Sequence, residues 1–257
     1  MDDAETTNHT ASAGHLDDPA TSARYDELAA GLAKVQARIT EAAELAQRNP
    51  AGITLLPVTK YHPVTDVALL HQLGVTAVGE SRINDAASKA AAVPEIAIHF
   101  IGQVQSKKTA AIARTCQAVH SVDSLRLVQR LEHGRALAVE AGLQPAERPL
   151  QVYLQYSYDN DPARGGTTPE RIRALASTLM EECAHLTFAG IMMMPPPTVN
   201  PKTAFAKGAE LLGELSATYG RTLGYSAGMS QDLEVAIGQG ATIVRVGTAI
   251  LGSPTLR

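Results

Sequence analysis

The 257-residue chain contains no tryptophan, only 3 phenylalanines and 7 tyrosines. It also lacks an excess of basic residues: Asp plus Glu is 26, Lys plus Arg is 22, and the net charge is −4. Proteins that bind nucleic acid usually present a positive face, and those that bind single strands add stacking aromatics. The composition therefore argues against a nucleic-acid partner.

Cysteine and long apolar segments are equally scarce. The only cysteines are Cys116 and Cys183, which excludes a disulfide scaffold and favours a reducing, cytoplasmic compartment. We expect both to be small, buried or half-buried apolar side chains. No segment approaches the roughly 18 apolar residues that span a bilayer, and the N-terminus lacks the basic start and apolar run of a secretory signal. Membrane association is not expected.

Over the whole chain, 45% of the residues are hydrophobic and 19% are charged, which is the composition of a folded globular protein. Residues 1–20 are polar and acidic and predict a disordered tail. Residues 21–257 contain no low-complexity linker, so we expect them to form a single domain.

That domain begins with a predicted helix at 21–48, which Asn49-Pro50 ends, and then alternates short apolar runs with helical segments. Eight apolar runs follow, and a helical segment comes after each of the first seven. The predicted strands are 53–59, 75–79, 97–102, 118–122, 150–157, 186–193, 222–228 and 242–247.

Short apolar strands without clean alternation are typical of parallel strands covered on both faces. Eight β–α units in this length match an α/β protein of the (β/α)8 TIM-barrel type, here with an additional N-terminal helix. A doubly wound open sheet is the alternative, but it usually has a glycine-rich first turn. The corresponding turn here, TKYHPV, contains no glycine.

The carboxyl ends of barrel strands normally carry the chemistry. Strand 1 ends in Thr59-Lys60. A lysine held away from water at the barrel mouth loses its proton more readily and becomes an amine nucleophile suited to Schiff-base formation. The alternative is a surface lysine that extends its amine into solvent.

Strands 7 and 8 end in small residues that open helical segments. Ser230 is expected to be a helix N-cap, and Gly247-Thr248 starts another helical turn. Free backbone N–H groups, hydroxyls and close backbone approach are what a phosphate group requires, and this pair of strands carries the phosphate site of many barrels. Ordinary helix capping is the alternative.

An amine able to form an imine and a phosphate site across the same barrel suggest a phosphorylated aldehyde, of which pyridoxal 5′-phosphate (PLP) is the obvious candidate. Arg245 on strand 8 would then donate to the pyridine nitrogen and leave it unprotonated. Such a cofactor is a weaker electron sink than one whose nitrogen faces a carboxylate.

Beyond these residues, the chain closely resembles the pyridoxal phosphate homeostasis protein family (YggS/PROSC), whose barrel is similar to that of alanine racemase. The resemblance implies that Lys60 is the Schiff-base lysine, and that Arg245 faces the pyridine nitrogen. It implies a phosphate site at Ser230, Gly247 and Thr248, with Met229 and Ser81 as further cofactor-binding positions. The segments that carry it are LLPVTKYHPV (55–64), VGESRIND (78–85), IHFIGQVQSKK (98–108), VHSVDS (119–124), RGGTTPE (164–170), GIMMMPP (190–196) and GMSQDLEVAIGQGATIVRVGTAILG (228–252).

The chain departs from the family pattern at the rim of the site. Ser81 stands where the family usually has Asn, Gln103 where His is common, Lys107 where Asn is common, and Arg164 where Lys is frequent. None of these positions is the lysine or a phosphate residue, so the departures concern the contact from strand 2 beside the PLP ring.

Other polar residues have less specific interpretations. His99 and His120 alternate with apolar neighbours, so we expect them to pack or hydrogen-bond inside the barrel. Glu80, at the end of strand 2, is expected to form an ion pair with Arg82, Lys60 or Arg245 rather than to act in catalysis.

The resemblance implies a PLP-binding protein of intracellular PLP homeostasis or carriage, without strong turnover and with apo-PLP enzymes as transient partners. A PLP-dependent racemase or decarboxylase with weak activity is the alternative, and a sugar-phosphate aldolase is a third hypothesis. Racemases of this barrel type add a C-terminal β-domain, whereas this chain ends about five residues after Gly252. A full racemase is therefore not expected. A monomer is the expected form, with a dimer as the alternative.

Overall fold

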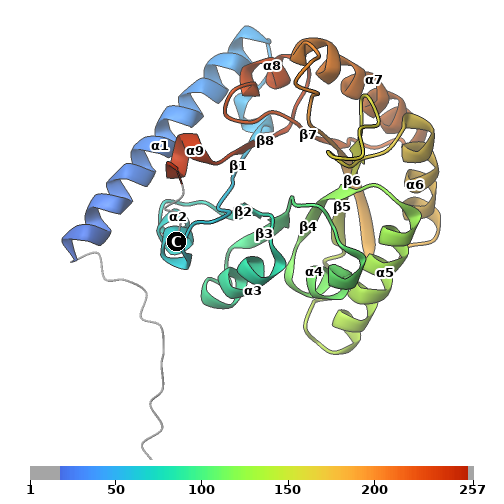
Figure 1. Ribbon diagram of the computed structural model, residues 1–257, viewed down its shortest axis with the longest axis horizontal. Helices are drawn as coiled ribbons and strands as arrows, with labels where there is room; N and C mark the ends of the chain where they lie inside the picture. The colour runs from blue at the N-terminus through green and yellow to red at the C-terminus, as the bar shows by residue number, and fades with distance from the viewer. Residues whose placement is uncertain (1–17, 254–257) are drawn as a thin grey trace, which may run out of the picture.

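The computed structural model describes residues 18–253 and contains one eight-stranded parallel sheet closed into a barrel (Figure 1). Each strand pairs with its neighbours in the chain, and β1 pairs with β8. A bridge between Val58 and Gly79 joins the end of β1 to β2 and closes the ring. The strands are β1 (Thr54–Pro57), β2 (Ala77–Glu80), β3 (Ala97–Phe100), β4 (Ala118–Val122), β5 (Leu150–Tyr156), β6 (Leu186–Met193), β7 (Gly224–Ser226) and β8 (Ile243–Val246).

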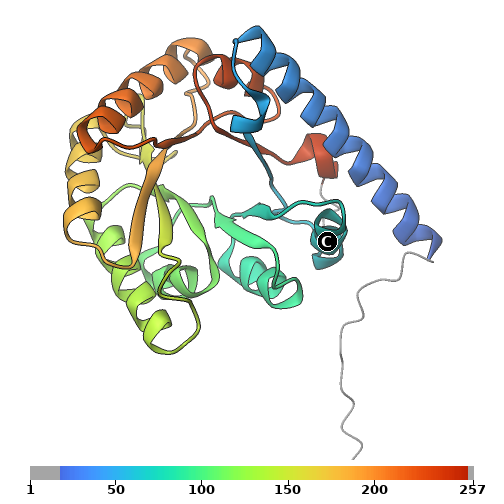
Figure 2. The same ribbon diagram turned by 180° about the vertical axis from the view of Figure 1, so that it is seen from behind.

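Helices surround the strands on the outside, and Figure 2 shows the same ring from behind. One α-helix follows each strand, and α1 precedes the barrel. The predicted (β/α)8 barrel with an additional N-terminal helix is therefore confirmed. The helices are α1 (Pro19–Leu45), α2 (Val64–Gln72), α3 (Ile83–Ala92), α4 (Thr109–Thr115), α5 (Leu125–Glu140), α6 (Pro169–Glu181), α7 (Pro201–Tyr219), α8 (Leu233–Gly238) and α9 (Thr248–Leu251).

Helix α1 begins earlier than its apolar spacing predicts, because Asp18 accepts a hydrogen bond from Thr21 N and Pro19 occupies the first turn. Residues 19 and 20 are therefore helical, and the rest of the predicted tail, 1–17, lies outside the described residues. The helix lies along α8, α9 and α2 (Figure 1). Arg24 joins α1 to α2 and α9, because it donates hydrogen bonds to both carboxylate oxygens of Asp66 and to Leu251 O.

The two faces of the strands pack against different cores. The larger core fills the space between strands and helices, whereas a smaller one inside the barrel contains Leu56, Ala118, Tyr153, Met192 and Ile243. Because side chains alternate along a strand, this assignment fixes the inward residues near the mouth. Gly79 in β2, His99 in β3, His120 in β4, Ser226 in β7 and Arg245 in β8 are in phase with the inner core.

Two further expectations can be compared with the structure. Cys116 is buried and Cys183 half-buried, and both are free, as expected, although each lies just past the end of a helix. In the described part of the chain, no helix combines the length and apolarity needed to cross a membrane.

Candidate functional site

Lys60 lies three residues after Pro57, the last residue of β1, at the carboxyl end of the barrel. Its strand lies beside β8 through the hydrogen bond from Val58 N to Val246 O (2.8 Å) and beside β2 through the one from Thr59 N to Gly79 O (3.0 Å). The side chain is exposed rather than desolvated by its neighbours. The position agrees with the prediction of a lysine at the barrel mouth. The predicted burial of its side chain is not observed.

Arg245 lies inside the barrel and is only 5% exposed. Its Nη1 donates to Ser226 Oγ (2.8 Å), and its Nη2 donates to Met193 O (3.2 Å). Burial lowers the pKa of Arg245 to about 10, and the charge of Asp232 opposes that shift. The guanidinium therefore remains charged at neutral pH. Since it carries five N–H groups, further donors are left for a ligand.

A chain of hydrogen bonds continues from Ser226 across the barrel. Ser226 Oγ lies 2.8 Å from His120 Nδ1, and His120 Nε2 lies 3.1 Å from His99 Nδ1. Burial lowers the pKa of His99 to about 4 and that of His120 well below its usual value. Neutral imidazoles suit a chain that ends on a buried cation. The expectation that both histidines hydrogen-bond inside the barrel is confirmed.

The loop after β7 is joined to the last part of β8, because Arg245 N donates to Gly228 O (2.9 Å). Gly228 has a φ of 92°, and a Cβ at that position would approach Ala236 Cβ to 2.7 Å. A glycine is therefore required where the chain turns into residues 229–232.

Ser230 is not the N-cap of α8 as predicted. Asp232 takes that position, and its carboxylate accepts from Met229 N (2.6 Å) while its own N–H donates to Met229 O (3.2 Å). This closed turn leaves Ser230 half-buried in the middle of the loop. Arg38 of α1 braces it, donating to Ser230 O (2.9 Å) and to Glu234.

Gly247 is the N-cap of α9, and Thr248, which is exposed, is its first residue. No side chain caps either α8 or α9. The backbone N–H groups of Ser230, Thr248 and Ala249 donate to no main-chain carbonyl of the loops and turns in residues 18–253. Free donors of this kind, together with two hydroxyls, are what a phosphate group requires.

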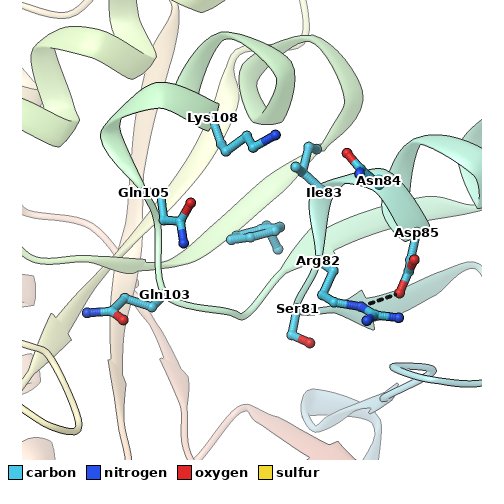
Figure 3. Close-up of a pocket in the computed structure, with 9 residues that line it drawn as sticks. Ser81, Arg82, Ile83, Asn84, Asp85, Gln103, Gln105 and Lys108 are labelled. Carbon is cyan, nitrogen blue, oxygen red and sulfur yellow. Dashed lines mark hydrogen bonds and ion pairs between the residues drawn. The ribbon is translucent and has the colours of Figure 1, made fainter.

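Ser81 and Gln103, two positions where the chain departs from the family pattern, line the same pocket (Figure 3). The pocket has a volume of about 340 Å³ and opens over the ends of β2 and β3. Figure 3 shows the bond between Arg82 Nε and Asp85 at one side and Lys108 at the other. The remaining lining residues are Ile83, Asn84, Phe100 and Gln105.

Glu80 forms an ion pair, as expected, but not with Arg82, Lys60 or Arg245, so the predicted partners are wrong. The side chain points away from the barrel interior and forms a buried ion pair with Lys89 of α3. Alternation explains the direction, since Gly79 is in phase with the inner core and Glu80 with the outer one. Lys89 was not singled out by the sequence, although it falls three residues after Ala86 and six after Ile83 on the buried stripe of α3.

The residues present fit PLP. A lysine at the end of β1, an inward guanidinium on β8, and free backbone N–H groups with two hydroxyls after β7 and β8 lie at one end of the barrel. By contrast, no group of three or more metal-ligating side chains occurs among the residues that the structure covers.

Comparison with known proteins gives the same family. Residues 30–254 match the family described as alanine racemase, N-terminal domain. The pyridoxal phosphate homeostasis protein of Corynebacterium glutamicum is 45% identical over 222 residues, covering 86% of this chain and all of the relative. That of Pseudomonas aeruginosa is 42% identical over 231 residues, with coverage of 88% and 95%.

Solved structures share the fold. A protein of unknown function from Bifidobacterium adolescentis superposes with a TM-score of 0.77 at 26% identity, covering 93% of this chain and 98% of its own. PipY of Synechococcus elongatus, solved with PLP bound, superposes with a TM-score of 0.70 at 29% identity, covering 83% of this chain and 100% of its own. Alanine racemase from Streptomyces coelicolor gives 0.65 at 16% identity and shares the fold, with 58% of its length covered. The chain belongs to the alanine racemase N-terminal domain family and, within it, to the pyridoxal phosphate homeostasis proteins.

Proposed function

We propose that this protein binds PLP at the mouth of its barrel, holds it as a Schiff base on Lys60, and serves intracellular PLP homeostasis or carriage in the cytoplasm. The observation that carries the proposal is the meeting of Lys60, Arg245 and the two donor-rich loops at one barrel end. The names of its relatives and the PLP bound to PipY support the same cofactor.

Each part of the site has a separate role in this proposal. Ser230, Gly247 and Thr248 would hold the phosphate through hydroxyl and backbone donors. Lys60 would supply the amine, while Met229 and Ser81 would border the cofactor from the loop after β7 and the end of β2. The cofactor supplies an aldehyde for the amine and a conjugated ring that can accept electrons.

Arg245 limits what that ring can do. A guanidinium donates hydrogen bonds and accepts none, so it favours an unprotonated pyridine nitrogen. Ser226 and Met193 O fix its direction, and the histidines behind Ser226 are neutral because burial lowers their pKa values. We therefore propose binding and release of PLP, with apo-PLP enzymes as transient acceptors and a monomer as the working form, rather than rapid racemisation or decarboxylation.

Titration of the purified protein with PLP tests this function. We expect a saturable visible absorbance band, and transfer of the bound PLP to an apo-PLP enzyme, measured as recovery of that enzyme's activity. The same preparation should interconvert L- and D-alanine at less than about one turnover per second, well below the median of enzymes. Rapid racemisation, or failure to develop the band, would contradict the proposal.

A further inference from the structure

Lys60 lies between two residues that are both contacted by the segment running from β2 into α3. Thr59, which precedes it, is fully buried. Tyr61, which follows it, has a left-handed φ of 67° and lies under the guanidinium of Arg82, 4.9 Å from its ring centre. Since a non-glycine residue seldom adopts such a φ, surrounding contacts must hold the backbone here.

Glu80 is the centre of the buried contacts on the Thr59 side. Its carboxylate accepts from Thr59 Oγ1 (2.8 Å) and from Ser81 N (3.2 Å), and it pairs with Lys89 Nζ. The side chain is fully buried, and that of Lys89 is 3% exposed. One carboxylate thus holds the residue before Lys60 on β1 and the backbone of Ser81 on β2.

Lys89 completes the hold on Thr59. Its Nζ donates to Thr59 O (2.7 Å), which also accepts from His62 N (3.0 Å). Thr59 N donates to Gly79 O (3.0 Å). The amide, the carbonyl and the hydroxyl of Thr59 are therefore all engaged, and two of these groups contact the Glu80–Lys89 pair.

A buried ion pair is a poor source of stability, because the loss of hydration offsets the attraction between the charges. Apolar side chains of similar size would fill the same space between β2 and α3. What they could not supply is the donor to Thr59 O and the acceptor for Thr59 Oγ1. The use of the pair therefore lies in these directional contacts.

We propose that Glu80 and Lys89, acting through Thr59, are positioning residues that aim Lys60 at the aldehyde of PLP. The inference rests on the proposed function, in which Lys60 forms the Schiff base. In that step the lysine amine attacks the aldehyde carbon, a C=N bond forms, and the oxygen leaves as one water molecule. The rate of such a condensation depends on the direction of the amine, and misplacement by about 1 Å can cost on the order of 100-fold.

Thr59→Val and Thr59→Ser test the proposal as a pair. Valine removes the hydroxyl that Glu80 holds, whereas serine keeps it. We expect Thr59→Val to slow Schiff-base formation, followed by stopped-flow absorbance with PLP, by at least about tenfold. Thr59→Ser should remain within about threefold of wild type. The affinity for PLP, measured by equilibrium dialysis of the same variants in a Lys60→Ala background, should change less than threefold, because the phosphate loops are untouched.

Thr109→Val is the matched control, since Thr109 is also buried and its hydroxyl donates to Ser106 O (3.0 Å) rather than to the Glu80–Lys89 pair. It should react at the wild-type rate. Should Thr59→Val fail to fold, Glu80→Leu with Lys89→Met replaces the pair by apolar side chains and should show the same slow reaction.

The outcomes separate the two proposals. Wild-type protein that forms no Schiff base at Lys60 overturns the proposed function itself. Wild-type protein that reacts, with Thr59→Val and the double variant reacting equally fast, overturns the positioning role alone. Equal losses of rate in Thr59→Val and Thr109→Val would show a general effect of a lost buried hydroxyl and would overturn it as well.

Discussion

Arg245 on β8 and Ser226 on β7 are joined by a 2.8 Å hydrogen bond inside the barrel, and the guanidinium is the donor. Because arginine accepts no hydrogen bond, Ser226 Oγ must use a lone pair for it and can direct its own proton at His120 Nδ1. His120 would then donate from Nε2 to His99. The direction of every bond in this chain follows from the charge at one end.

Ser226→Ala tests that chain. The substitution leaves a buried guanidinium N–H and a buried imidazole nitrogen without a partner, since Ser226 is fully buried. We expect a loss of about 1–3 kcal/mol in the free energy of unfolding, measured by urea denaturation. Ser88→Ala on the exposed face of α3 is the control and should change it by less than about 0.5 kcal/mol. Equal stabilities for the two variants would show that this chain of hydrogen bonds does not form in solution.

The same histidines predict how stability depends on pH. Burial lowers the pKa of His99 to about 4 from an ordinary 6.5, so the folded state binds fewer protons than the unfolded state in that interval. The free energy of unfolding should therefore be highest above pH 6.5 and should fall as the pH drops toward 4. For His99 the loss is on the order of 3 kcal/mol.

Denaturation curves collected across that interval check this prediction. His99→Gln should flatten the dependence, whereas His133→Gln, at an exposed position on α5, should leave it unchanged. A dependence as steep in His99→Gln as in wild type would assign the titration to other groups.

The phosphate loops can be tested separately from the lysine. Ser230→Ala and Thr248→Ala should each weaken PLP retention by about tenfold, because a hydrogen bond to a charged group contributes about 1.5–3 kcal/mol. The visible band at saturating PLP should persist, since Lys60 is unchanged. Equilibrium dialysis and spectra on the same samples measure both effects, with Thr218→Ala on α7 as an exposed control. Retention unaffected in the double variant would remove the phosphate site from these loops.

Lys89→Met should be among the most destabilising single changes in the barrel. It leaves Glu80 as an unpaired, fully buried charge, and such changes typically cost about 3–5 kcal/mol. Adding Glu80→Leu should restore a large part of that loss, because the pair is then replaced by apolar packing. Thermal and urea unfolding of the two variants give the comparison. A double variant less stable than Lys89→Met would mean that the pair itself stabilises the fold.

The barrel could be predicted because its signal is repeated eight times in the chain. The apolar runs, the helical segments between them and the absence of glycine after the first strand all agree. Helix boundaries were less predictable. Asp18 lies before the first apolar position of α1, so periodicity alone misses it. Asp232 rather than Ser230 occupies the N-cap position of α8, and its carboxylate accepts from Met229 N in the preceding loop.

The sequence indicated where a residue lies along its strand, but not in which direction every side chain points. Lys60, Arg245 and Thr248 occupy strand ends at one end of the barrel, as expected. The partner of Glu80 was wrong, because the phase of β2 turns it outward to α3. A lysine on the apolar stripe of a helix signals a buried acid nearby, and Lys89 was that signal.

The most direct test of the account is reduction of the PLP-loaded protein with borohydride, followed by peptide mapping. Reduction converts a lysine Schiff base into a stable pyridoxyl label. We predict a label on Lys60, its loss in Lys60→Ala, and its retention in Lys34→Ala, a variant of an exposed lysine on α1. A label on any other lysine, or none on wild-type protein saturated with PLP, would contradict the assignment of this barrel end as the PLP site.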